Sequence, residues 1–401
     1  MVRSRRAWFG AGAVVFTCSL ACACSSARST AHEAGGASNE AQPASGGERP
    51  SAAGTGASDS NESGASFGGT GPAEPNSGGA ASANPSAGGK SSATGGNTAS
   101  AGTSGSTSSG GRRVFYLDVQ GSVRAFDEDK PTPRTLVSSA GKGPDGIAVD
   151  VAGGHVYWTT MGVPADNDGS LLRSELDGSK MTTIVAAGGS YTPKQLKLDL
   201  AARQLYWSDR EGMRIQRAAT DGTGLETLVT VATGDSARKN AENWCVGLAL
   251  DVAHGFVYWT QKGPDNGMVG SIRRAHLQMP NGETASTRTD IEILFDKLPE
   301  PVDLDLDLAA GQMYWSDRGD DTISRAAIEI PSGKTAATRG DREILVRGVR
   351  EAIGVTLDLE RGHVYYTSGA SGRVGRANLD GSGAVDLVTG TGALTGIAVV
   401  P

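Results

Sequence analysis

The chain has 401 residues, of which 58 are glycine, and a formal net charge of −7 at neutral pH. A mildly acidic chain lacks the basic face that nucleic-acid binding requires, so we exclude nucleic acid as a partner. Most of the excess glycine lies in the first part of the chain, which predicts an unfolded segment before the folded one.

Residues 1–24 are predicted to be a targeting segment. Three arginines precede the apolar stretch 7–23, which is too short and too rich in small residues to be a good membrane span. Its end, Leu20-Ala21-Cys22-Ala23-Cys24, resembles a bacterial lipoprotein signal, which implies that Cys24 is lipidated and becomes the first residue. Cys22 is the alternative, because neither cysteine has the usual leucine three residues before it. An ordinary secretory signal cleaved near the same place is the other interpretation.

Residues 25–112 are predicted to be a flexible linker. They are nearly all Gly, Ser, Ala, Thr, Asn and Pro, and so cannot bury enough apolar surface to offset the entropy lost on ordering. A chain of this kind spans roughly 50 Å between its ends. With Cys24 lipidated, the protein would lie in the cell envelope, at the outer membrane or the cell surface, and the lipid anchor would be its only membrane contact.

Residues 113–401 contain six copies of a short aromatic motif, separated by about the length of one four-stranded propeller blade. From the second copy onward an Asp stands seven residues before the motif Tyr and ends a strand-like run: Asp150, Asp199, Asp251, Asp307 and Asp358. The copies are Phe115-Tyr116-Leu117-Asp118, Tyr157-Trp158-Thr159-Thr160, Tyr206-Trp207-Ser208-Asp209, Tyr258-Trp259-Thr260-Gln261, Tyr314-Trp315-Ser316-Asp317 and Tyr365-Tyr366-Thr367-Ser368.

Each aromatic motif is the second strand of a predicted four-stranded unit. A third strand-like run ends in Arg and a small residue, and in three units an Asp-Gly turn, such as Asp177-Gly178, leads to a fourth run. Asp-Gly between two such runs indicates a tight hairpin, because Gly accepts positive φ. Six units of four antiparallel strands predict an all-β, six-bladed propeller.

The two ends of residues 113–401 complement each other. The chain closes with 396–400, which matches the first strand of a unit, as in 146–150, but no aromatic strand follows. The aromatic strand stands at the other end, as 114–118, where the first strand is missing. We therefore expect the C-terminal strand to pair with the N-terminal strands in one blade, which closes the ring and removes the free sheet edges.

These units resemble the YWTD (class B) repeats of the low-density lipoprotein receptor family, over all of 113–401. The chain departs from the family pattern at Leu117, Thr160, Gln261, Tyr366 and Ser368. The resemblance implies a six-bladed propeller that binds proteins outside the cell or serves as a structural module. A receptor role does not carry over, because the epidermal-growth-factor-like modules that accompany receptor propellers are absent.

The motif residues themselves are expected to be structural. Tyr and Trp should pack between neighbouring blades. Three copies end in Asp: Asp118, Asp209 and Asp317. We expect this Asp to pair with the Arg that recurs in the third strands, which is Arg217, Arg274, Arg325 and Arg376 in four of the units. Cys245 is expected to be a small buried apolar residue. No nucleophile elbow, phosphate loop or zinc spacing occurs, which argues against an enzyme without excluding one.

A ligand site is expected where the blades differ. We define the loop face as the face with the loops after the second strands and between blades, and the turn face as the opposite one. On the loop face, the loop 161–169 carries Asp166 and Asp168, and the connection 231–244 ends in Trp244. Trp244 is either a binding anchor or a cap on its blade. Tyr191 lies at the equivalent place one blade earlier.

The axial channel is the second candidate site. The first strands should line it, and most have small residues there, whereas two carry Gln195, Lys197, Asp303 and Asp305. We interpret these as a polar cluster in which Lys197, or a bound cation such as calcium, balances the acids. A water-filled structural network is the alternative. No other cofactor is expected, and the identity of any metal is left open.

These observations leave two functional hypotheses. The first is a cell-envelope lipoprotein that displays a monomeric propeller for binding an envelope or extracellular protein or a glycan. The second is a six-bladed-propeller hydrolase or lactonase that uses the channel acids and a divalent cation. The lengthened hairpins 280–288 and 331–339, which resemble each other, would form a ridge for a partner or reflect a blade duplication.

Overall fold

The computed structural model describes residues 111–164 and 166–401. The predicted signal with Cys22 and Cys24, and the predicted linker up to residue 110, lie outside the described residues. Arg112 belongs to the fold: it is 7% exposed and donates hydrogen bonds to both carboxylate oxygens of Asp358. In the described part, no helix is long and apolar enough to cross a membrane.

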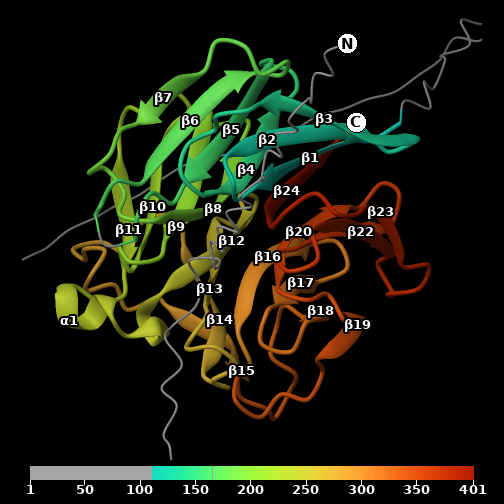
Figure 1. The fold of residues 1–401 in the computed structure, drawn as a ribbon. Helices are drawn as coiled ribbons and strands as arrows, with labels where there is room; N and C mark the ends of the chain where they lie inside the picture. The colour runs from blue at the N-terminus through green and yellow to red at the C-terminus, as the bar shows by residue number, and fades with distance from the viewer. Residues whose placement is uncertain (1–110, 165) are drawn as a thin grey trace, which may run out of the picture. The chain divides into compact units, whose positions relative to one another are not determined.

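The described residues form six four-stranded antiparallel sheets, arranged as blades around an axis, as predicted (Figure 1). Blade 1 contains β24 (Leu394–Val400), β1 (Arg113–Asp118), β2 (Ser122–Asp127) and β3 (Lys130–Val137). Blade 2 contains β4 (Pro144–Asp150), β5 (His155–Thr160), β6 (Ser170–Glu175) and β7 (Thr182–Val185). Blade 3 contains β8 (Pro193–Asp199), β9 (Gln204–Asp209), β10 (Arg214–Ala219) and β11 (Glu226–Thr230).

The remaining blades repeat this order. Blade 4 contains β12 (Cys245–Asp251), β13 (Phe256–Gln261), β14 (Gly270–His276) and β15 (Glu292–Leu298). Blade 5 contains β16 (Pro301–Asp307), β17 (Gln312–Asp317), β18 (Thr322–Ala327) and β19 (Glu343–Arg347). Blade 6 contains β20 (Ala352–Asp358), β21 (His363–Ser368), β22 (Arg373–Asn378) and β23 (Val385–Val388). The connection between blades 3 and 4 carries α1 (Asp235–Arg238) and the 3₁₀ turn η1 (Ala241–Asn243).

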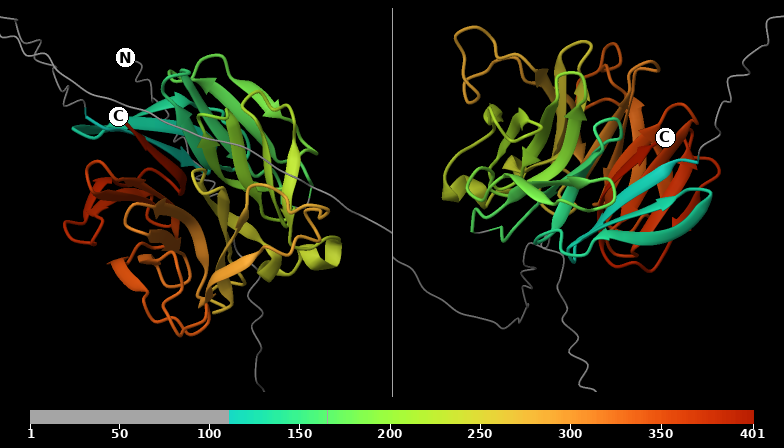
Figure 2. Two further views of the ribbon diagram at one scale, coloured as in Figure 1. Left: turned by 180° about the vertical axis from the view of Figure 1, so that it is seen from behind. Right: turned by 90° about the horizontal axis from the view of Figure 1, so that it is seen from above.

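The ring closes as predicted. The C-terminal strand β24 pairs antiparallel with β1, with Arg113 opposite Val400 and Asp118 opposite Leu394. Figures 1 and 2 show the dark red C-terminal strand lying beside the blue-green strands of blade 1. Because the pair runs in this register, both Arg113 and Val400 lie at the turn face.

The motif aromatic residues pack between the blades, which confirms their predicted role. The tryptophans of four motifs are fully buried, and the motif tyrosines are at most 3% exposed: Trp158, Trp207, Trp259 and Trp315, with Tyr116, Tyr157, Tyr206, Tyr258, Tyr314 and Tyr365. Burying a large aromatic side chain in every blade interface supplies much of the apolar burial that holds the ring together.

The third motif residue is a hydroxyl that links each blade to the next. Thr260 accepts a hydrogen bond from the Gly247 N–H of its own inner strand at 2.7 Å and donates to the Val302 carbonyl of blade 5 at 2.7 Å. The hydroxyls of the other blades donate to the equivalent carbonyl of the following blade: Thr159, Ser208, Ser316 and Thr367. Blade 1 has Leu117 at this position, and there Thr395 of β24 donates to the Pro144 carbonyl instead at 2.8 Å.

The motif Asp pairs with a third-strand arginine in two of the three predicted blades, but not with the repeated one: Asp118 pairs with Arg124 and Asp209 with Arg214. In blade 3, Asp209 accepts hydrogen bonds from the backbone N–H groups of Tyr191 and Thr192 and from Arg214, so it fixes the connection from blade 2. The repeated arginines pair instead with glutamates at the outer part of the blades: Arg217 with Glu226, Arg274 with Glu292 and Glu329, Arg325 with Glu343, and Arg376 with Glu128.

Candidate functional site

A β-bulge near the start of every inner strand shapes the channel. The pairing of the inner strand with its neighbour shifts at the same point in all six blades. A bulge breaks the alternation of side chains between the two faces of a strand. The residues at this point are each at most 4% exposed: Asp145, Lys194, Val246, Val302, Ile353 and Thr395. Four of them, from blades 3 to 6, line one small enclosed cavity, so side chains fill the loop-face end of the channel.

Buried ion pairs complete this plug. Lys194 Nζ lies 2.5 Å from Asp145 Oδ2, and both side chains are at most 3% exposed. Lys262 contacts the buried carboxylate of Glu300, which Arg318 also contacts at 3.0 Å. Burial raises the pKa of Glu300 although both cations oppose the rise. Because each buried charge has a partner, this cluster is a structural seal.

Three of the predicted channel residues lie together. Nζ of Lys197 in blade 3 lies 3.8 Å from Oδ2 of Asp305 in blade 5, two blades further around the ring. Asp303 and Asp305 accept hydrogen bonds from backbone N–H groups of blade 6, those of Val355 and Leu357, both at 3.0 Å. Burial lowers the pKa of Lys197, but the charges of Asp305 and Asp303 outweigh it and raise that pKa.

Gln195, the fourth predicted channel residue, lies apart from this group. Its amide donates to Asp145 at 3.2 Å, so it belongs to the plug. Glycine stands at the equivalent position in most blades because neighbouring inner strands approach closely there. A Cβ on Gly146 would lie 2.4 Å from the Lys194 carbonyl oxygen. The row of glycines therefore serves blade packing more than it widens the channel.

Asp303 is the most perturbed acid of the channel. Its side chain is buried, and burial raises its pKa to about 7, against the opposing effects of Lys197 and the Val355 N–H. Within the described residues, no group of three or more His, Cys, Asp or Glu side chains could hold a metal ion. The carboxylates of Asp303 and Asp305 are instead occupied by backbone N–H groups and Lys197.

The predicted anchors of the loop face hold the connection between blades 3 and 4. Trp244 is half-buried, and its indole N–H donates to the carbonyl of Arg238 at 2.8 Å. The guanidinium of Arg210 lies 4.9 Å from the Trp244 ring centre. Lys262 of the plug lies 5.6 Å from the same ring centre, so Trp244 lies beside the plug. Arg238 in turn stacks on Tyr191, with its guanidinium carbon 3.9 Å from the ring centre.

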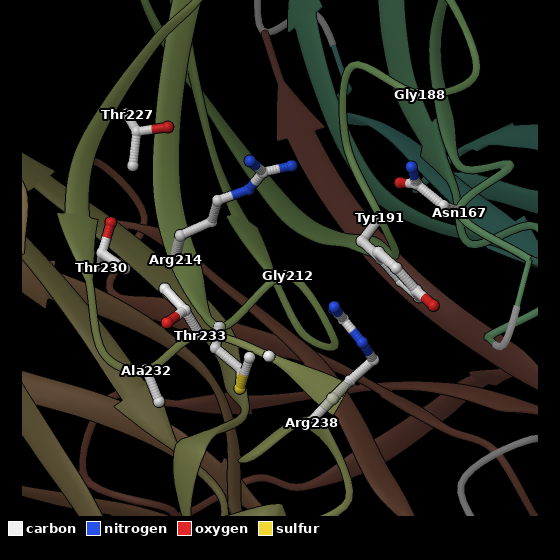
Figure 3. Close-up of a pocket in the computed structure, with 12 residues that line it drawn as sticks. Asn167, Gly188, Tyr191, Gly212, Arg214, Thr227, Thr230, Ala232, Thr233 and Arg238 are labelled. Carbon is white, nitrogen blue, oxygen red and sulfur yellow. The ribbon is translucent and has the colours of Figure 1, made fainter. Parts of the chain in front are cut away.

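Tyr191 and Arg238 line a groove of about 400 Å³ on the loop face between blades 2 and 3 (Figure 3). The close-up shows Asn167 on the far side of Tyr191 and Arg214 above the loop that carries Thr233. The charged residues of the lining are both arginines, Arg214 and Arg238, and none of the described lining residues is acidic. Arg214 pairs with Asp209 at 2.8 Å and Arg238 with Asp235 at 3.6 Å, and both carboxylates lie outside the lining. The charged groups that face the groove are therefore guanidinium groups, which an anionic group would complement.

The two acids predicted in the loop 161–169 do not line this groove. Asp168 accepts a hydrogen bond from the Val163 N–H at 2.5 Å and one from Lys142 at 3.1 Å. Partial burial raises the pKa of Asp168, but these two hydrogen bonds outweigh it and leave the pKa lowered. Asp166 is exposed. Asp168 therefore fixes the loop, and the neighbouring Asn167 is the residue that reaches the groove.

The two lengthened hairpins clamp each blade to the one before it. Arg339 has a fully buried side chain and donates to the Leu294 carbonyl of blade 4 at 2.6 Å. Arg288 donates in the same way to the Leu228 carbonyl of blade 3 at 2.7 Å. The similarity of the two hairpins thus has a packing reason.

Comparisons with known proteins identify the family. No family model matches the chain. A protein of Pyricularia oryzae named low-density lipoprotein receptor-related protein 1 is 41% identical over 311 residues, which cover 72% of this chain and 98% of that protein. The chain belongs to the low-density lipoprotein receptor-related protein family. This confirms the resemblance carried by the YWTD-type repeats.

Further relatives of this family member differ in how much they share. The 3-hydroxyacyl-CoA dehydrogenase-like protein LAM1 of Cochliobolus heterostrophus is 37% identical over 299 residues, and the match covers 69% of this chain but only 62% of that protein. Among solved structures, a chain of a nidogen/laminin complex has a TM-score of 0.55 at 23% identity, covering 72% of this chain and 98% of that chain. That similarity shows the shared propeller fold.

Proposed function

We propose that this low-density lipoprotein receptor-related family member is a cell-envelope lipoprotein, anchored through Cys24, whose propeller binds a partner protein at the loop face. The observation that carries the binding function is the positive groove lined by Tyr191, Arg214 and Arg238. An aromatic ring with two arginines around it is the composition typical of binding hot spots.

The groove lies where blade 3 departs from the repeat. The connection that follows this blade carries α1, and Trp244 fixes it through the Arg238 carbonyl. Arg238 is oriented by its stack on Tyr191 and by a hydrogen bond to the Glu211 carbonyl. A preorganised arginine loses little entropy on binding, so the groove suits an acidic segment of a partner. A similar propeller chain occurs in a nidogen/laminin complex, which supports protein binding as the function.

Thr233 offers a test that leaves the fold intact, because it is exposed and lines the groove. A Thr233→Glu variant should capture its partner from extracellular and envelope proteins at least about tenfold more weakly, since a like charge opposes an acidic ligand. Thr233→Lys is the matched control and should bind as well as the wild type or better. Equal capture by both variants would show that the groove is not the site.

The second candidate function is a hydrolase that uses the channel acids. The pKa of Asp303, about 7, is the observation that favours it, because a general base needs a pKa near the working pH. Its substrate would have to enter from the turn face, since side chains fill the loop-face end of the channel. Calcium calorimetry on the wild type and on an Asp303→Asn, Asp305→Asn variant tests the cation: heat of binding that the variant loses supports the hydrolase, and no heat ends it.

A further inference from the structure

Five exposed aliphatic side chains occupy one position of five successive blades. Each directly follows the repeated Asp that ends the inner strand, and so lies at the turn face close to the axis. We call them the aliphatic ring: Val151 is 47% exposed, Leu200 58%, Val252 47%, Leu308 39% and Leu359 48%. In blade 1 the equivalent residue is Pro401, which is exposed and follows β24. Single exposed aliphatic residues are ordinary, but a set repeated at one position makes a patch.

The surface between these side chains is also apolar. The next residue of four turns is an exposed alanine: Ala152, Ala201, Ala253 and Ala309. The five ring residues belong to none of the buried apolar clusters of the described fold. Between 39% and 58% of the surface of each ring residue therefore remains exposed on the propeller.

The ring has the shape of a flat collar. Because each member stands at the same position of its blade, the side chains lie at the same height around the axis. The charges at its centre, Lys197 and Asp305, lie deeper in the channel and are paired. A flat apolar collar with few charges suits an extended apolar surface better than a peptide, which needs a groove.

The N-terminal part of the chain joins the propeller at this same collar. Arg112 is held by Asp358 and Glu360, the two residues that flank Leu359. The hydrogen bonds that Arg112 donates to both carboxylates raise the pKa of its guanidinium, so this attachment is ionic at every physiological pH. The 110 residues that precede the described chain, with Cys24 among them, are therefore connected to the propeller beside the aliphatic ring.

We propose that the aliphatic ring rests on a lipid surface and orients the propeller so that its loop face points away from the membrane. The inference builds on the proposed lipid anchor, because an anchor raises the local concentration of lipid at the ring. The surrounding turns of the same face carry exposed charges of both signs, such as Asp177, Lys180 and Asp380, so zwitterionic lipid fits better than strongly anionic lipid. The loop-face groove is then free to meet a partner.

The test uses the chain from residue 25 onward, which lacks the apolar signal and the lipid; the propeller is closed by its own strands and does not need them. Flotation with phosphatidylcholine and phosphatidylethanolamine vesicles should carry the wild type. The variant Leu200→Gln, Leu308→Gln, Leu359→Gln should bind at least about tenfold less. The matched control, Val163→Gln, Met268→Gln, Val269→Gln, changes residues of similar exposure on the loop face and should float like the wild type.

Each outcome decides the assignment. Loss of flotation in the ring variant alone supports it, whereas equal loss in the control, or a wild type that does not float, overturns it. Light scattering after size exclusion tests whether a second copy of the chain occupies the ring instead of lipid. A wild-type dimer that is a monomer in the ring variant would overturn the lipid assignment. The capture experiment with the Thr233 variants tests the groove independently. A negative flotation result would therefore leave the proposed partner binding at the groove unaffected.

Discussion

Replacing Thr260 by Val tests whether the motif hydroxyl joins the blades. Thr260 is fully buried, and its hydroxyl is the partner of the Gly247 N–H and the Val302 carbonyl, each at 2.7 Å. Valine has nearly the same shape, so packing is kept while both backbone groups lose their partner. Each unsatisfied buried group costs about 1–3 kcal/mol, so the free energy of unfolding should fall by about 3 kcal/mol. For a domain of this size the melting temperature should fall by roughly 6 °C.

Two further variants isolate the hydroxyl from the methyl group. Thr260→Ser keeps the hydroxyl, as Ser208 and Ser316 do in other blades, and should cost only about 1 kcal/mol. Thr183→Val changes an exposed threonine of β7 and should leave stability unchanged. Urea denaturation of the three variants measures the differences. If Thr260→Val were no less stable than Thr260→Ser, the link between blades would reside in the aromatic packing alone.

Three other predictions concern charge, the hairpin clamp and the anchor. Folding raises the pKa of Asp303 from an ordinary value of 3.8 to about 7, so the folded state binds the carboxyl proton more tightly than the unfolded state. The stability gained from this proton is complete below pH 4 and is lost as the pH rises through 7. Melting temperatures should therefore fall between pH 5 and pH 8, and Asp303→Asn should flatten that slope. Arg339→Ala leaves the Leu294 carbonyl without its partner and should cost about 3 kcal/mol in urea denaturation, and a cost below about 1 kcal/mol would contradict the clamp. Metabolic labelling with a fatty acid should mark the wild type and Cys22→Ser but not Cys24→Ser, and label retained by Cys24→Ser would disprove the assigned anchor.

The blade count, the strand order and the closure of the ring could be predicted because each follows from spacing along the chain. A motif that recurs at blade length, with an Asp seven residues before it, fixes four strands and their turns. The split unit at the two ends needs no side-chain information either. The sequence showed Leu117 only as a departure from the motif, whereas the structure shows that Thr395 of the inner strand makes the hydrogen bond to the next blade in its place.

The plug could not be predicted from the alternation of side chains along the inner strands. Asp145 and Lys194 stand one residue before the row that the sequence assigned to the channel, and strict alternation would point them away from it. The bulge turns them inward, and Gln195 then pairs with Asp145 rather than with Lys197. The partner of a long side chain depends on such local geometry. For the same reason, the sequence did not show that the motif Asp209 accepts hydrogen bonds from backbone N–H groups and does not pair with the repeated Arg.

The same bulge gives the propeller two unlike faces. By turning six side chains into the channel at one end, it seals the loop face and leaves variation there to the connections between blades, where the positive groove lies. At the other end the inner strands alternate regularly, so the residue after each repeated Asp comes to the surface at the same height in every blade. A face built by repetition is flat and uniform, and a face built by insertions is specific. This division is the physical basis of our two proposals, partner recognition at the loop face and contact of the aliphatic ring with an extended apolar surface.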